Sequence, residues 1–94
     1  MEIIKQTENF TLTEVTEAYA INGNITNSAS GQLNVHFTIS KAEGEHVGDC
    51  YYSRQTETGS SNFSLTCPEE NRSEVTTYTT SVIDSVLDYF KQVD

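Results

Sequence analysis

Basic residues are scarce in this sequence: five lysines and arginines stand against fourteen aspartates and glutamates, for a formal net charge of −9. Proteins that bind DNA or RNA directly need a cationic surface that displaces counterions from the phosphates. Five scattered cations do not provide such a surface, so we expect no direct nucleic-acid binding. Binding to an anionic membrane surface is disfavoured for the same reason.

Long apolar runs are also missing, and no segment approaches the roughly 20 residues that a membrane-spanning helix requires. The first ten residues, MEIIKQTENF, have an acid at position two and lack the apolar core of a secretory signal. We therefore expect a cytoplasmic protein. Four Asn-x-Ser/Thr triplets point the other way, because they are glycosylation acceptors in secreted proteins. They begin at Asn9, Asn24, Asn62 and Asn71.

Cysteine and histidine are rare, with two of each. A zinc site built from them would need all four side chains, and the strand pattern described below places His36 on the face opposite the cysteines. The glycines are isolated, so no phosphate-binding loop is present. We expect no metal site and no cofactor.

The most regular pattern in the chain is QLNVHFTIS at residues 32–40, where polar and apolar residues alternate without a fault. Leu33, Val35, Phe37 and Ile39 would share one face of a strand, and the polar residues would share the other. We interpret this segment as a central strand with one buried face.

The strand before it is placed by testing turns. A loop at residues 27–31 would pair Ile25 with Leu33 and keep the apolar side chains on the inner face. We prefer this loop to a hairpin turn at Asn22-Gly23, although Asn-Gly is a strong hairpin signal. Gly23 then lies inside a strand and indicates a kink or a close approach of another chain segment.

The strand after the central one is placed by pairing Lys41 with His46, which sets Phe37 opposite Cys50. The last strand ends at Cys67, and its register has two solutions. A turn at residues 58–59 would place Cys50 opposite Cys67, where a cross-strand disulfide is feasible. A turn at residues 59–60 would move Cys67 away from Cys50, so the redox state of the cysteines stays open.

After Pro68 the apolar residues recur every three or four positions, which predicts an amphipathic helix over residues 73–93. The run TTYTT at residues 76–80 is a poor helix former. Residues 73–80 are therefore either helical or extended, whereas residues 81–92 are helical under both interpretations.

These elements predict an α+β fold, with residues 1–94 as a single domain. Residues 15–67 would form a four-stranded antiparallel meander with the C-terminal helix packed on one face. Residues 1–12 would be an N-terminal arm or an edge strand, which would raise the number of strands to five. A shift of the alternating pattern at Glu14–Val15 indicates a bend or a bulge.

The sheet face away from the helix is predicted to be almost uncharged. His36 and Tyr51 lie near its centre, with Asn22 and Thr66 in the same row. One interpretation is an ordinary solvated face, rich in Ser and Thr because they suit strands. The other is a docking surface for a protein partner, with His36 and Tyr51 as anchors.

His36 is the only candidate for a general base, with Asp49 diagonal to it on the next strand. No nucleophile motif, oxyanion loop or predicted concavity accompanies the pair. We therefore expect a protein without enzymatic activity and assign no catalytic residues.

In profile (short, acidic, a sheet with one helix, no catalytic set) the chain resembles the small phage-encoded inhibitors of bacterial defence systems, anti-CRISPR proteins among them. This resemblance of type, which covers no specific motif, implies binding to a basic, nucleic-acid-handling protein. An acidic surface can occupy a basic channel in place of the phosphate backbone. Besides His36, Tyr51 and Asp49, we expect the partner-binding residues to be the loop acids Glu43, Glu45, Glu57, Glu69, Glu70 and Glu74.

The alternative hypothesis is a structural or self-assembling β-sheet module, with secretion as one version of it. Its polar face or an edge strand would pair with a second copy to form a homodimer.

Overall fold

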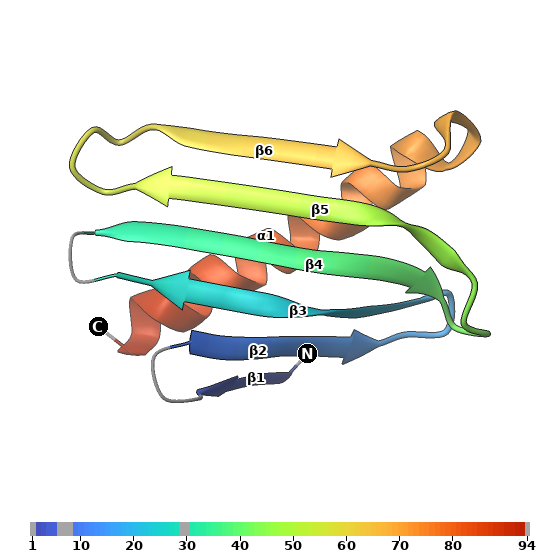
Figure 1. The fold of residues 1–94 in the computed structure, drawn as a ribbon, viewed down its shortest axis with the longest axis horizontal. Helices are drawn as coiled ribbons and strands as arrows, with labels where there is room; N and C mark the ends of the chain where they lie inside the picture. The colour runs from blue at the N-terminus through green and yellow to red at the C-terminus, as the bar shows by residue number, and fades with distance from the viewer. Residues whose placement is uncertain (1, 6–8, 29–30, 94) are drawn as a thin grey trace.

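The computed structural model of the chain (Figure 1) describes residues 2–5, 9–28 and 31–93. Within these residues the chain forms six strands, a short 3-10 turn (η1) and one long helix (α1). The elements are β1 (Glu2–Lys5), β2 (Asn9–Val15), β3 (Tyr19–Asn27), β4 (Gln32–Lys41), β5 (His46–Gln55), β6 (Ser61–Thr66), η1 (Glu69–Asn71) and α1 (Arg72–Val93).

The strands form one antiparallel sheet in the order β1-β2-β3-β4-β5-β6, so that each strand pairs with its neighbours in sequence. Helix α1 runs diagonally behind the sheet in Figure 1, from the end of β6 toward the side of β2 and β3. The predicted α+β class, with an antiparallel sheet and one C-terminal helix, is confirmed. The predicted number of four or five strands is wrong.

The two additional strands come from the N-terminal segment, which we expected to be a single arm or edge strand. It forms β1 and β2, which pair with each other through Ile3 opposite Leu12. Ile3 packs on the core and Ile4 is exposed. The expected bend at Glu14–Val15 is also absent, because β2 continues through Val15 before the chain turns.

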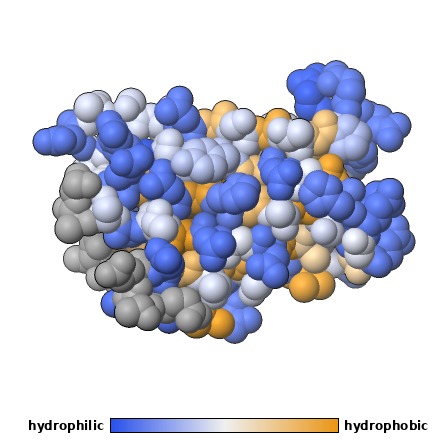
Figure 2. All heavy atoms as spheres, viewed as in Figure 1, coloured by the Kyte–Doolittle hydropathy of each residue, from blue (hydrophilic) through white to orange (hydrophobic). Residues whose placement is uncertain are grey.

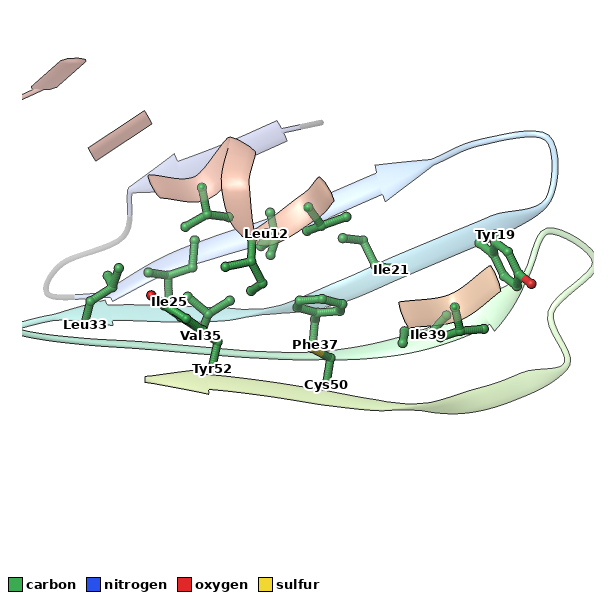
Figure 3. Packing of buried hydrophobic residues seen from close by; sticks show 14 of the residues in the cluster. Leu12, Tyr19, Ile21, Ile25, Leu33, Val35, Phe37, Ile39, Cys50 and Tyr52 are labelled. Carbon is green, nitrogen blue, oxygen red and sulfur yellow. The ribbon is translucent and has the colours of Figure 1, made fainter. Parts of the chain in front are cut away.

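The core lies between one face of the sheet and α1 (Figure 3). Leu33, Val35, Phe37 and Ile39 are all buried, as the alternating pattern predicts. The buried side chains of the helix are Val75, Thr79, Val82, Ile83, Val86 and Phe90.

Aromatic contacts attach both halves of the helix to the sheet, and Phe10 contacts Tyr89 as well as Phe90. The Phe10 and Phe90 rings meet edge to face with their centroids 5.0 Å apart. The Tyr19 and Tyr78 rings stack with their centroids 5.4 Å apart. Such pairs contribute about 0.5–1.5 kcal/mol beyond the area they bury.

The TTYTT run is helical, which settles the question left open for residues 73–80. Val75 and Thr79 are fully buried, so tertiary packing outweighs the low helix propensity of the threonines. The Thr79 hydroxyl donates to the Val75 carbonyl oxygen at 2.8 Å and is thereby satisfied inside the core. Among the described residues, no helix is long and apolar enough to cross a membrane.

The register between β3 and β4 differs from our prediction by two residues, since Ile25 lies opposite Val35 and not Leu33. The inner face is unchanged by this even shift, but Gly23 now lies opposite Phe37. A Cβ atom at Gly23 would lie 2.5 Å from the Phe37 Cα. The close approach predicted at this glycine is confirmed, and it allows the largest side chain of β4 to pack there.

The register between β4 and β5 is predicted correctly over most of its length, with Phe37 opposite Cys50. Toward the turn, Ile39 faces Gly48 but Ser40 faces His46, so the predicted pairing of Lys41 with His46 is wrong. Val47 is the extra residue of a β-bulge, which explains why both Val47 and Gly48 are buried.

Neither predicted register between β5 and β6 is correct, because Cys50 lies opposite Leu65. The chain reverses through residues 56–59, a longer turn than either two-residue turn that we considered. The Gln55 amide donates to the Ser60 carbonyl oxygen and the Gly59 amide to the Gln55 carbonyl oxygen, both at 2.9 Å. Cys50 and Cys67 are both free.

Candidate functional site: the acidic end of the sheet

A meander places alternate connections at opposite ends of its sheet. The β2–β3 turn, the β4–β5 turn and the connection from β6 to α1 therefore share one end, on the right in Figure 1. The first two of these connections touch, since the Ala42 amide donates to the Ala18 carbonyl oxygen at 3.1 Å.

Exposed glutamates gather at this end of the sheet. The β2–β3 turn, the β4–β5 turn, η1 and the first turn of α1 each contribute at least one. We call the group the acidic end, and it consists of Glu17, Glu43, Glu45, Glu69, Glu70 and Glu74.

Two cations lie among these acids, and each already has a partner. Lys41 Nζ lies 3.4 Å from Glu45 Oε2. Arg72 Nε lies 3.4 Å from Glu69 Oε1. The described residues provide no cation within ion-pair distance of Glu17, Glu43 or Glu70. The acidic end therefore keeps a net negative charge.

Two tyrosines connect this end to the core. Burial raises the pKa of Tyr19, and the Glu74 carboxylate beside it raises the pKa further. Burial also raises the pKa of Tyr78 to about 12, with the Glu14 carboxylate adding to the effect. Because the two tyrosine rings stack on each other, the start of α1 and its glutamate are held at a fixed place on the sheet.

The sequence-predicted acids divide between the two ends of the sheet. Most of them belong to the acidic end, whereas Glu57 lies in the β5–β6 turn at the opposite end. Glu17 was not predicted, although its position was within reach of sequence reasoning. Any turn separated from the β4–β5 turn by two strands of a meander must share its end of the sheet.

The outer face of the sheet places His36 directly opposite Tyr51, as predicted, with ring centroids 6.1 Å apart. Their row continues to Asn24 on β3 and Ser64 on β6. The predicted neighbours Asn22 and Thr66 are wrong because of the register differences described above, and they lie one row away, opposite Thr38 and Asp49.

The centre of this outer face is polar and almost uncharged, and Figure 2 shows hydrophilic side chains spread across it. The Tyr51 hydroxyl donates to Asn34 Oδ1 at 3.4 Å, a long hydrogen bond. Asp49 Oδ2 lies 3.9 Å from His46 Nε2, and Asp49 has no such contact with His36 among the described residues. The expected diagonal pair of His36 and Asp49 is therefore not joined by a bond.

The described residues contain no group of three or more His, Cys, Asp or Glu side chains that could hold a metal ion. A shallow hollow of about 340 Å³ lies beside the C-terminal half of α1. Arg54, Leu87, Asp88, Phe90 and Lys91 line it. Comparison of the chain with protein-family models, with curated proteins and with solved structures finds no significant match.

Proposed function

We propose that the protein is a non-enzymatic binding protein that recognises a basic protein surface through its acidic end. The observation that carries the proposal is the presence of six exposed glutamates at one end of the sheet, with the two nearby Lys and Arg side chains already paired. Like charges that share one end of a sheet repel one another, and a cationic partner relieves that repulsion. The long-range field of a chain with a net charge of −9 also accelerates the encounter with such a partner.

The partner class follows from the same electrostatics. Proteins that handle DNA or RNA carry channels lined by Lys and Arg side chains, which bind phosphates spaced along a backbone. Carboxylates that project from the turns at one end of the sheet can occupy such a channel and compete with the nucleic acid. The proposal is therefore inhibition of a nucleic-acid-handling protein in the cytoplasm, in the manner of phage-encoded inhibitors of host defence.

A matched pair of charge-reversal variants tests this function. One variant carries Glu43→Lys, Glu45→Lys and Glu70→Lys at the acidic end. The control carries Glu2→Lys, Asp84→Lys and Asp88→Lys on β1 and α1, which changes the net charge equally, away from the acidic end. Affinity purification from a cell extract followed by mass spectrometry should recover basic proteins with the parent chain and the control, and not with the acidic-end variant.

The salt dependence provides the second measurement. Binding of a recovered protein to the parent chain should weaken at least tenfold between 0.1 and 0.5 M NaCl, because the screening length falls from ~10 Å at 0.1 M toward ~3 Å at 1 M. Equal loss in both triple variants, or binding that is insensitive to salt, would contradict the proposal.

The alternative function, self-assembly, is favoured by one observation: the His36–Tyr51 contact lies on a polar face that is almost free of charge at its centre. If this face joins two copies, light scattering will give a dimer mass that Tyr51→Ala reduces to that of the monomer. If the protein is a monomer at 0.1 mM, self-assembly is refuted and only the electrostatic proposal remains.

A further inference from the structure

The two edges of the sheet differ in how they are protected. Strand β1 has four residues and carries Glu2 and Lys5 at its ends. Strand β6 has six residues, SNFSLT, without a charge or a proline, and its pairing with β5 has no bulge. Natural edge strands are usually blunted by charges, prolines, bulges or short length, which prevents another strand from pairing with them. In the described part of the chain, β6 has none of these except modest length.

The backbone groups that point outward from β6 can be identified from the turn before it. The Gln55 amide donates to the Ser60 carbonyl oxygen at 2.9 Å, so the backbone of Ser60 faces β5. Because the direction alternates along a strand, Asn62, Ser64 and Thr66 face β5 as well. The N–H and C=O groups of Ser61, Phe63 and Leu65 therefore point toward the free edge.

An apolar side chain accompanies these groups. Phe63 lies opposite Tyr52 on the helix side of the sheet, yet it is 43% exposed. The reason is visible in Figure 1, where α1 crosses the sheet diagonally and leaves the first half of β6 uncovered. A strand that paired with β6 would bring its own side chains against Phe63 and would shield it from water.

The charges around β6 indicate which strand this edge accepts. Glu57 lies in the turn before β6, and Glu70 lies in η1 after it beside Glu69, which is paired with Arg72, so an acid outside any ion pair of the described residues flanks the edge at each end. A second copy pairing antiparallel would bring Glu57 of one chain toward Glu69 and Glu70 of the other. Parallel pairing would bring each acid toward its own equivalent. Both arrangements are repulsive, which disfavours a second copy.

We propose that an extended segment of the basic partner adds to β6 as a seventh strand of the sheet. This segment carries an apolar residue that covers Phe63 and a Lys or Arg near each end, about 20 Å apart, which is the length of six extended residues. Backbone hydrogen bonds supply the docking geometry, as in other strand-addition complexes. The charge of the segment rests on the proposed function, whereas the pairing rests on the edge itself.

The test uses a synthetic peptide of β-forming residues with a lysine at each end, such as acetyl-KTVTFTK-amide, and amide hydrogen exchange followed by NMR. The expected result has a period of two residues. The amides of Ser61, Phe63 and Leu65 gain protection when the peptide is bound. The intervening amides of β6 do not change, because they are already bonded to β5.

Two variants at one position separate the backbone from the side chain. Phe63→Thr keeps the outward N–H group and removes the ring, whereas Phe63→Pro removes both, and proline is tolerated at edge positions. Peptide affinity, measured by fluorescence anisotropy at 50 mM NaCl, should fall further for Phe63→Pro than for Phe63→Thr by at least fivefold. Circular dichroism and the melting temperature establish that each variant is folded.

The outcomes distinguish this inference from the proposed function. Absence of peptide binding, protection without the two-residue period, or equal affinities of the two Phe63 variants would overturn strand addition and leave the acidic end as the binding site. A peptide with glutamate in place of its lysines should bind at least tenfold more weakly. Equal binding of that peptide would support strand addition to β6 and refute the proposal that the added segment is basic. If the protein is a dimer at 0.1 mM and Phe63→Pro dissociates it, the strand that pairs with β6 belongs to a second copy, and the proposal of a basic partner segment is wrong.

Discussion

Gly23 lies on the inner face of β3 directly opposite Phe37, and the two backbones approach too closely for a side chain at this position. A Cβ atom there would lie 2.5 Å from both the Cα and the Cβ of Phe37. Gly23→Ala should therefore lower the free energy of unfolding by about 2–3 kcal/mol, the upper part of the usual cost of overpacking, since the backbone of β4 cannot move aside easily.

Urea denaturation measures this change. The matched control is Asn24→Ala on the next residue, whose side chain is exposed on the outer face, and it should change the stability by less than about 0.5 kcal/mol. If Gly23→Ala were as stable as Asn24→Ala, the close packing of β3 against Phe37 would be wrong.

Cys50 is fully buried between the sheet and the helix, and burial raises the pKa of its thiol to about 12. In the unfolded chain a thiol titrates near 8.5. Between these values the unfolded state loses a proton that the folded state keeps, so the free energy of unfolding falls as the pH rises. The slope contributed by this one group approaches about 1.4 kcal/mol per pH unit above pH 9.

Urea denaturation between pH 8 and pH 10, with a reducing agent present, measures that slope. Cys50→Ala should lower the stability at pH 8 because it leaves a small cavity, but its pH dependence should be shallower than that of the parent chain. Parallel pH profiles for the two chains would refute the assignment to Cys50.

At the scale of the elements, α1 contains threonines that the core requires and threonines that it does not. Thr79 is fully buried, whereas Thr80 beside it is exposed. Thr80→Ala should raise the free energy of unfolding by about 0.5 kcal/mol, because alanine has the higher helix propensity. Thr79→Ala should lower it by about 1–2 kcal/mol, because it removes packed atoms from the core. Thermal denaturation of the two variants gives opposite shifts if this helix packs as described, and shifts of the same sign would contradict it.

The elements also show which sequence signals were sufficient. The alternation in β4 predicted both its faces, because a single slip would have moved four apolar side chains into water. The β5–β6 register was wrong because Gly59 suggested a two-residue turn, and the four-residue turn that forms has no equally distinct sequence signal. The bulge at Val47 was missed because the sequence does not distinguish a bulge from a simple break in the alternating pattern. Both place two adjacent residues that do not alternate.

At the scale of the whole molecule, the candidate site follows from counting strands. The acids were recognised individually from the sequence. Their position at one end of the sheet follows from the meander order, in which alternate connections lie at opposite ends. Strands β1 and β2 matter here only because they keep that order. The His36–Tyr51 contact was predictable because the register of β4 with β5 was correct over its central residues. The exposure of Phe63 was not, because the diagonal path of α1 is set by aromatic contacts between residues far apart in the sequence.

The net charge of −9 gives the last prediction, which concerns the stability of the whole chain. Repulsion among the exposed glutamates of the acidic end opposes folding, and the surface ion pairs Lys41–Glu45 and Arg72–Glu69 contribute little against it. Raising NaCl from 20 to 300 mM should therefore raise the melting temperature, by on the order of 5 °C for a domain of this size.

A variant with Glu17→Gln, Glu43→Gln and Glu70→Gln should melt higher than the parent chain at 20 mM NaCl and gain less from added salt. Glu57→Gln serves as the single-charge control at the opposite end of the sheet and should gain nearly as much from salt as the parent. If salt lowered the melting temperature, ion pairs would dominate the electrostatics, and the acidic end would hold no repulsion for a basic partner to relieve. A salt-induced rise that the triple variant lacks would place the repulsion at the surface where we propose that the partner binds.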